Sequence, residues 1–241
     1  MNKSNKFSSP IFDGLIFDGL IFDFNGVLFW DDHLQRQSWR EFTKKFRSRP
    51  LTDEEINIHV HGRNGKYTLE YLVGHAISQA EADDWMEQKE SIYREMCLCL
   101  DGEFRLSPGA IDLLDGLVEN QIPCTIATAS AQGNLNFFIE HLELANWFDL
   151  EKIAYDNGQI AGKPAPDLYL AAAEYLNLSP GKCVVIEDSL SGIQAAHAAG
   201  IGHIIALGPE STHKQLAQQN GVNQIIENLS QVQIASLFNH E

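Results

Sequence analysis

The chain has 241 residues and a formal net charge of −16, with 44% hydrophobic and 21% charged residues. This is an ordinary globular composition, with room for one large domain or for a core domain with a smaller inserted one. The acidity argues against binding to nucleic acid or to an anionic membrane, because both need clustered Lys and Arg. If the substrate is an anion, a local positive charge or a divalent metal must offset this field at the site.

The chain has four cysteines, Cys97, Cys99, Cys124 and Cys183. They show no CxxC or other metal-type spacing, and two of them occupy strand-like apolar positions where a thiol acts as a small hydrophobic group. We therefore expect free thiols in a reducing cytoplasm. Independently of the cysteines, the protein is expected to be a monomer or a weak dimer.

A short motif, Ile-Phe-Asp-Gly-Leu, occurs twice within residues 11–20 and begins a third time at residue 21. Its acidic residues, Asp13, Asp18 and Asp23, interrupt the apolar stretch, so neither a signal peptide nor a membrane span fits. Only the third copy continues into Asn-Gly-Val-Leu. We interpret residues 1–20 as a segment that precedes the first strand, in which Asp13 and Asp18 are structural or solvent-facing.

The hydrophobic pattern divides the rest of the chain into two parts. Residues 31–102 have a helical periodicity with no convincing strand. From Ser107 onward strands and helices alternate, which is typical of parallel βαβ units. The sequence therefore predicts an α/β fold, with a Rossmann-like parallel sheet core of residues 21–30 and 103–241 and an all-helical insertion of residues 31–102.

The expected elements of the core follow one another in regular alternation. We expect strands at 123–128, 151–155, 183–187 and 203–207, after a first strand that begins at residue 21. Helices are expected at 109–119, 132–143, 167–176 and 190–199, followed by a helix, a short strand and a final helix.

Polar residues stand where several of these strands end. Asp23 closes the first strand ahead of an Asn-Gly turn, and Thr128, Ala129 and Ser130 close the second. Open α/β sheets bind ligands at the carboxyl ends of their strands, and free N–H groups at a helix start suit an anion. Each motif also has a plain explanation, because Asp caps turns and Thr and Ser cap helices.

Two further motifs strengthen the pattern. Lys163 lies in a Gly-Lys-Pro turn ahead of a helix, although lysines are mostly solvated. Glu187 and Asp188 follow an apolar strand, and two adjacent carboxylates there need a cation or hydrogen bonds to offset desolvation and repulsion. With oxygen ligands, the natural cation is Mg²⁺, held by carboxylates, water and substrate phosphate.

With these four motifs in this order, the chain from about residue 21 to its C-terminus resembles the haloacid dehalogenase superfamily, in its phosphatase and beta-phosphoglucomutase-like branch with a helical cap. The resemblance implies that Asp23 is the nucleophile, forms an aspartyl-phosphate and binds Mg²⁺. It implies that Thr128, beside Ala129 and Ser130, hydrogen-bonds the phosphoryl group. Lys163 would neutralise the charge on nucleophile and phosphate. Asp188 would be a metal ligand, and Glu187 would bond a metal-bound water.

The chain departs from this family at Asn25, where phosphatases and mutases normally carry a second Asp. The backbone carbonyl, which the family uses for Mg²⁺, is unaffected. An amide cannot act as a general acid or base, a role that contributes about 10²- to 10⁴-fold.

Three explanations for Asn25 remain open. The substrate could be an acyl phosphate, an aryl phosphate or a pyrophosphate, whose leaving group needs no proton. A cap histidine could substitute, and the candidates are His33, His59 and His61. The protein could instead bind a phosphorylated ligand without turnover. Hydrolytic deamidation at Asn25-Gly26 would regenerate an Asp.

The cap offers few specificity residues. Arg63, beside Gly62, is the better candidate because its fork suits phosphate or sugar oxygens. Trp39 falls where related enzymes place substrate contacts, although it shares a helical face with two phenylalanines, as a core residue does.

The sequence thus predicts a cytoplasmic, Mg²⁺-dependent phosphatase of a small phosphorylated metabolite. The alternatives are a phosphosugar mutase and a non-catalytic phosphometabolite-binding protein. A dehalogenase fits less well, because Lys163, Glu187 and Asp188 suit a metal-bound phosphate better than a carbon-halogen bond.

Overall fold

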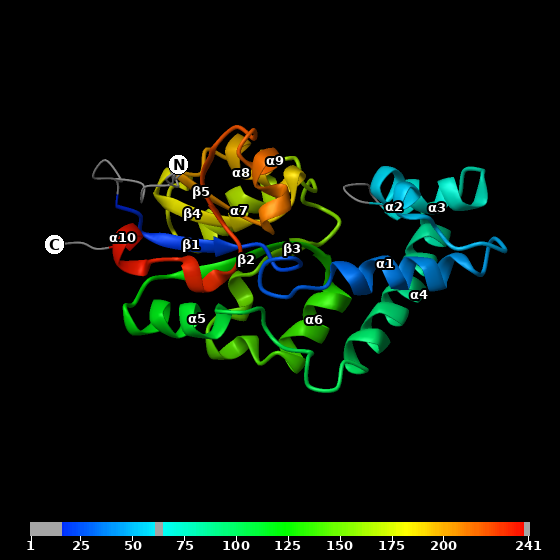
Figure 1. Ribbon diagram of the computed structural model, residues 1–241, viewed down its shortest axis with the longest axis horizontal. Helices are drawn as coiled ribbons and strands as arrows, with labels where there is room; N and C mark the ends of the chain where they lie inside the picture. Colours follow the sequence, from blue (N-terminus) through cyan, green and yellow to red (C-terminus); the bar gives the residue numbers. More distant parts are fainter. Residues whose placement is uncertain (1–15, 61–64, 239–241) are drawn as a thin grey trace, which may run out of the picture. The chain divides into compact units, whose positions relative to one another are not determined.

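The computed structural model describes residues 16–60 and 65–238, which form two compact units (Figure 1). The core unit contains the described residues up to Leu28, together with Ser107–Ala129 and the described residues from Leu144 onward. The cap unit contains the described residues of Phe29–Leu106 and Ser130–Glu143. The helical insertion expected at 31–102 lies within the cap unit, which also includes the helix after the second strand.

The core unit is built on a six-stranded sheet in the order β3-β2-β1-β4-β5-β6. Its strands are β1 (Gly19–Phe22), β2 (Cys124–Ala131), β3 (Ala154–Asp156), β4 (Cys183–Glu187), β5 (His203–Leu207) and β6 (Val222–Ile226). Strand β1 pairs in parallel with β2 and β4, and the pairs β4-β5 and β5-β6 are also parallel. The strand order reverses at β1, which is the topological switch point where such sheets bind ligands.

Apolar runs explain why these strands are central. Every residue of β1, β4 and β5 is buried, as expected for parallel strands that are covered on both faces. The covering helices of the core unit are α5 (Ala110–Glu119), α7 (Asp167–Tyr175), α8 (Leu190–Ala198), α9 (His213–Leu216) and α10 (Ile234–Phe238). The expected alternation of strands and helices is confirmed, with boundaries that shift by a few residues.

The first strand begins earlier than predicted. Gly19 and Leu20, the last residues of the second motif copy, already pair with β4, opposite Cys183 and Val184. The interpretation that this whole copy precedes the strand is therefore wrong at its end, because Leu20 is fully buried in the sheet. Asp18 lies just outside the strand and is partly exposed, with a carboxylate oxygen 3.8 Å from the ammonium of Lys182. Asp13 lies outside the described residues.

The cap unit is helical, as predicted. It contains α1 (Asp32–Thr43), α2 (Asp53–His59), α3 (Gly65–Val73), α4 (Gln79–Leu98) and α6 (Gln132–His141). Apolar residues of the first four helices pack into one core, which includes Trp39, Phe42, Ile56 and Leu69. Among the described helices of the whole chain, none combines the length and apolar character needed to cross a membrane.

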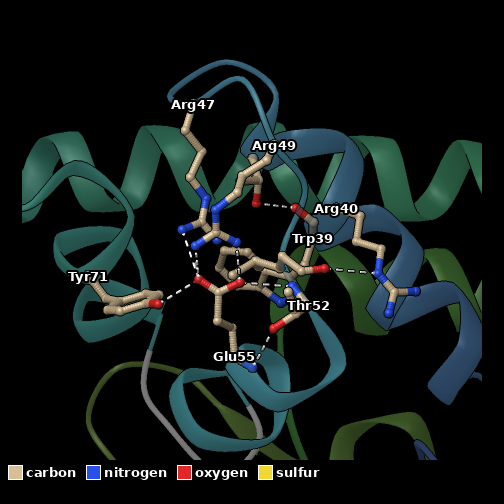
Figure 2. Close-up of polar contacts among 9 residues, drawn as sticks. Trp39, Arg40, Arg47, Arg49, Thr52, Glu55 and Tyr71 are labelled. Carbon is tan, nitrogen blue, oxygen red and sulfur yellow. Dashed lines mark hydrogen bonds and ion pairs between the residues drawn. The ribbon is translucent and has the colours of Figure 1, made fainter.

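The carboxylate of Glu55 connects the short helices of the cap through hydrogen bonds (Figure 2). Glu55 of α2 accepts hydrogen bonds from Arg47 at 3.0 Å, from Arg49 at 2.8 and 3.0 Å, and from the Tyr71 hydroxyl of α3 at 2.7 Å. The hydrogen bond from Arg49 is the main reason that the pKa of Glu55 lies well below its usual range. The ring of His59 stacks on Tyr71 with centroids 3.7 Å apart. These contacts join α2, α3 and the segment after α1.

Candidate active site

Strand β1 delivers Asp23 to the carboxyl edge of the sheet. The strand ends at Phe22, and the backbone N–H of Asp23 donates to the carbonyl of Ile186 at 3.0 Å, which extends the pairing with β4 by one residue. The Asp23 side chain is buried, with 7% of the residue exposed. Its carboxylate therefore lies in a place where water does little to stabilise a charge.

Lys163 supplies a positive charge to this carboxylate. It lies in the loop between β3 and α7, and its Nζ is 2.5 Å from Oδ1 of Asp23 and 2.7 Å from Oε1 of Glu187. Burial alone would lower the pKa of Lys163, but the carboxylates of Asp23 and Glu187 outweigh it and keep the pKa above its ordinary value. The two carboxylates therefore favour the charged ammonium form of this side chain.

Glu187, the last residue of β4, is completely buried and fully hydrogen-bonded. Its Oε1 accepts from Lys163 and, at 3.0 Å, from the hydroxyl of Tyr169 on α7. Its Oε2 accepts from the backbone N–H of Ser189 at 2.7 Å and from the Ser189 hydroxyl at 3.0 Å. A carboxylate offers about four acceptor positions, so these four bonds use its capacity.

Glycine at position 192 makes room for this carboxylate. A Cβ atom at Gly192 would lie 1.5 Å from Oε1 of Glu187, so the first turn of α8 can approach only without a side chain there. A second glycine, Gly26, lies in the turn after β1 with a φ of 85°, and a Cβ there would lie 2.1 Å from Oδ2 of Asp188. The half-buried Asn25 precedes it. Both glycines are therefore required by the packing of the site.

Three carboxylates gather at this edge of the sheet, with oxygen atoms of Asp23, Glu187 and Asp188 all within 4.8 Å of one another. Burial raises the pKa of Asp23 to about 7, against the opposing effect of Lys163. Burial also raises the pKa of Asp188 well above its usual value, and the charges of Glu187 and Asp23 add to this effect. One ammonium cannot neutralise three carboxylates, so the donor set fits a second, oxygen-preferring cation such as Mg²⁺.

Strand β2 brings Thr128 to the same edge. Ile126 pairs with Phe22, so Thr128 stands two residues beyond that pair on the neighbouring strand, and it is 1% exposed. Ala129 is exposed and is the last residue of this segment in the core unit, whereas Ser130 belongs to the cap unit. The core unit thus brings together Asp23, Lys163, Glu187 and Asp188, with Thr128 at the adjacent strand end.

The cap residues proposed from the sequence have different surroundings. Trp39 is buried in the cap core, where its ring packs edge-on against Phe42 with centroids 6.2 Å apart. His33 is exposed, and Nδ1 of His59 lies 3.0 Å from the Tyr67 hydroxyl. Gly62, Arg63 and His61 lie outside the described residues, so their predicted roles stay predictions.

Two contributors to the site were not identified from the sequence, namely Tyr169 and Ser189. Tyr169 follows Leu168 on the apolar face of α7, where a tyrosine is easily taken for a core aromatic residue. The sequence feature that could have identified Tyr169 is its hydroxyl, because a buried tyrosine usually has a hydrogen-bond partner. Ser189 is the N-cap of α8, and its side chain also accepts from the N–H of Gly192.

Comparisons with known proteins show which family the chain resembles. The model of the haloacid dehalogenase-like hydrolase family matches residues 17–200. The phosphorylated carbohydrates phosphatase of Thermotoga maritima is 29% identical over 183 residues, which cover 76% of this chain and 81% of that protein. Hexitol phosphatase A of Escherichia coli is 28% identical over 217 residues, which cover 88% of this chain and 91% of that protein.

A solved structure shows the same fold. The crystal structure of a HAD hydrolase, family IA, variant 3 from Entamoeba histolytica has a TM-score of 0.85 and 37% sequence identity, and covers 91% of this chain and 96% of that chain. The match to the family model spans well over half of the sequence and includes all four motifs. The chain therefore belongs to the haloacid dehalogenase-like hydrolases, as its motifs indicated.

Proposed function

We propose that this protein is a Mg²⁺-dependent phosphatase that acts on a small phosphorylated metabolite, with Asp23 as the nucleophile. The observation that carries the proposal is the buried pairing of Asp23 with the Lys163 ammonium at 2.5 Å, inside a group of three carboxylates. Phosphoryl transfer needs a nucleophile and preorganised positive charge, and this arrangement offers a carboxylate with a buried ammonium beside it. Two relatives that carry phosphatase names support the same type of reaction.

The carboxylates of Asp23 and Asp188 and the backbone carbonyl of Asn25 would hold the metal ion. Bound there, Mg²⁺ would supply positive charge to the oxygens of a phosphate group. Glu187 has its four acceptor positions occupied, so the role predicted for it toward a metal-bound water requires that it give up one hydrogen bond. We assign Glu187 instead to the placement of Lys163.

The reaction proceeds in two displacements. In the first, a carboxylate oxygen of Asp23 forms a bond to phosphorus while the bond from phosphorus to the leaving oxygen breaks, which gives an aspartyl-phosphate. Lys163 offsets the charge on the nucleophile and on the phosphoryl oxygens, and the Thr128 hydroxyl donates to one of those oxygens. In the second, water attacks the phosphorus, the bond from phosphorus to the Asp23 oxygen breaks, and inorganic phosphate leaves with the proton that the water gives up, so that the Asp23 carboxylate is restored.

Asn25 narrows the class of substrate. Its amide cannot protonate a departing sugar alkoxide, whereas an aryl or acyl leaving group departs without a proton. The preferred substrates are therefore aryl or acyl phosphates, or pyrophosphates. A phosphosugar mutase is disfavoured, because both halves of its cycle move a proton on a sugar hydroxyl.

The test is Mg²⁺-dependent phosphate release by the wild type, Asp23→Asn and Asn25→Asp with one aryl, one acyl and one sugar phosphate. We expect the wild type to hydrolyse the first two substrates and Asp23→Asn to hydrolyse none. Asn25→Asp should hydrolyse the sugar phosphate about 10²- to 10⁴-fold faster than wild type. Turnover that survives in Asp23→Asn would contradict the proposal.

Asn25 also favours a second candidate, a protein that binds a phosphorylated ligand without turnover. This second candidate predicts that the wild type binds phosphate in the presence of Mg²⁺ and hydrolyses none of the three substrates. An active Asn25→Asp variant beside an inert wild type would establish this alternative, and turnover by the wild type would exclude it.

A further inference from the structure

We propose that Tyr169 is a positioning residue of this site, which fixes the Lys163 ammonium against Asp23. Tyr169 is fully buried on α7 and contacts two charged groups at once. Its ring centroid lies 4.9 Å from Nζ of Lys163, and its hydroxyl donates to Oε1 of Glu187 at 3.0 Å. Its effect on catalysis rests on the phosphatase function proposed above, whereas its effect on Lys163 does not.

The ring limits where the ammonium can go. A lysine side chain is flexible, so a defined position of its nitrogen requires contacts in more than one direction. Asp23 and Glu187 provide two of them, at 2.5 and 2.7 Å. The face of Tyr169 provides a third, at a distance where cations are attracted to aromatic rings.

The hydroxyl acts through Glu187. Oε1 of Glu187 accepts from both Lys163 and Tyr169, while Ser189 donates twice to Oε2. Both oxygens are therefore held from different sides, and the carboxylate plane is fixed. Without the Tyr169 hydroxyl, Oε1 keeps its hydrogen bond from Lys163 but loses the one that holds it toward α7, so the carboxylate can rotate and move the ammonium with it.

A purely structural role would not need this hydroxyl. Tyr169 belongs to one apolar cluster with Leu168, Ala172 and Ala173, where a phenylalanine ring would fill the same space. What phenylalanine lacks is the bond to Glu187. The two contacts can therefore be separated, because Tyr169→Phe keeps the ring over Lys163 whereas Tyr169→Leu removes both ring and hydroxyl.

Displacement of the ammonium should affect the transition state more than the bound substrate. Preorganised charge accelerates a reaction when it is aimed at charge that develops in the transition state. We expect Tyr169→Phe to lower kcat about tenfold, with KM within about twofold of wild type, as for one lost hydrogen bond to a charged group. The inhibition constant of orthovanadate, which mimics the transferring phosphoryl group, should rise by a similar factor, and that of inorganic phosphate should change little.

The kinetic experiment compares wild type, Tyr169→Phe, Tyr169→Leu and the control Tyr175→Phe with an aryl phosphate and Mg²⁺. Tyr175 ends the same helix and is 37% exposed, so its variant should match wild type. Tyr169→Leu should lose more of kcat than Tyr169→Phe. The proposal is overturned if kcat and the vanadate constant of Tyr169→Phe stay within twofold of wild type, or if its KM rises as much as kcat falls.

A second measurement keeps the proposal testable without turnover. The rate at which an amine-reactive reagent modifies Lys163 is followed by peptide mass spectrometry, with the half-exposed Lys152 as internal reference. Lys163 should react slowly in wild type and at least about fivefold faster in Tyr169→Leu, because the ammonium is released. An unchanged rate would overturn the proposal. A wild type that hydrolyses nothing, with faster labelling in Tyr169→Leu, would refute the phosphatase and leave the positioning role intact.

Discussion

Nζ of Lys163 lies 2.5 Å from Oδ1 of Asp23, although 140 residues separate the two in the sequence. Glu187, 24 residues further along the chain, joins them through the same ammonium. The parallel sheet explains this convergence, because β1 and β4 are neighbours and both deliver a carboxylate at the same edge. The site is thus a consequence of the topology, and its charge balance can be tested residue by residue.

The first prediction concerns Lys163→Met. This change removes a buried cation that faces Asp23 and Glu187, and breaking a buried pair in this way typically costs about 3 to 5 kcal/mol of unfolding free energy. Without this ammonium the pKa of Asp23, which burial already raises, should rise further, so the loss is larger at alkaline pH and smaller where Asp23 is protonated. Urea unfolding at two pH values measures it, with Lys152→Met, 48% exposed, as the matched control. Equal stability of Lys163→Met and wild type would contradict the account.

The second prediction concerns the chemistry of Asn25-Gly26. The backbone nitrogen of Gly26 can attack the side-chain carbonyl of Asn25 and expel ammonia, after which water opens the cyclic imide to an aspartyl or isoaspartyl residue. Glycine favours the attack because it has no side chain in the way. Protein kept at mildly alkaline pH should gain the mass of amide-to-acid conversion in the peptide with Asn25, and activity on a sugar phosphate should rise with the aspartyl fraction.

The control for this prediction is Asn25→Gln, which lengthens the side chain and slows ring closure. It should show neither the mass change at that position nor the rise in activity. If wild-type protein keeps its mass under the same conditions, the idea that Asn25 is a latent aspartate is excluded.

The third prediction is a pH effect from His203 on β5. The residue is 3% exposed, and burial lowers the pKa of His203 from 6.5 to about 4. Between pH 4 and pH 6.5, His203 therefore binds a proton in the unfolded chain but not in the folded protein. The contribution of neutral His203 to stability is complete above pH 6.5 and is lost as the pH falls toward 4. The loss corresponds to about 3 kcal/mol.

Unfolding curves of wild type and His203→Phe across this pH range isolate the effect from the many carboxylates that both proteins share. The free energy of unfolding of His203→Phe, relative to that of wild type, should increase as the pH falls. A difference in stability that does not change with pH would show that His203 is not buried in its neutral form.

The fourth prediction concerns the effect of the Glu55 hydrogen bonds on the stability of the cap. Glu55→Gln weakens charge-assisted hydrogen bonds to Arg47 and Arg49, and we expect a loss of about 1 to 3 kcal/mol. Because the pKa of Glu55 is lowered, its contribution is present above pH 4.5 and is lost only in stronger acid. Glu54→Gln, at an exposed position of the same helical turn, should unfold like wild type. If Glu55→Gln and Glu54→Gln unfold alike, the hydrogen bonds of the Glu55 carboxylate have no net effect on stability.

The sequence predicted most of the fold because its apolar runs and helical periods are regular. Residues 183–187 and 203–207 were expected as strands and form β4 and β5 with those bounds. The start of β1 was misplaced because the repeated motif offers the same apolar residues in two registers, and only pairing with β4 distinguishes them. The placement of α6 in the cap unit depends on tertiary contacts, which local patterns do not encode.

Within the site, strand ends and residue types indicated Asp23, Lys163, Glu187 and Asp188, and the structure brings these four together. The hydrogen bonds that fill the capacity of Glu187 could not be predicted. They depend on the distance between α7 and β4, which places Tyr169 beside a carboxylate 18 residues further along. A tyrosine at an apolar helical position predicts burial, but its hydroxyl partner is set by packing.

Asp23 accepts the phosphoryl group in the proposed reaction, and a phosphoryl-trapping experiment measures this step directly. The protein is mixed with Mg²⁺ and an isotopically labelled acyl phosphate, quenched in acid during turnover and digested for peptide mass spectrometry. We predict a label that hydroxylamine removes, as it does from acyl phosphates, on the peptide with Asp23, and no label in Asp23→Asn. Phosphate release by wild type without label at Asp23, or label that persists in Asp23→Asn, would contradict the account.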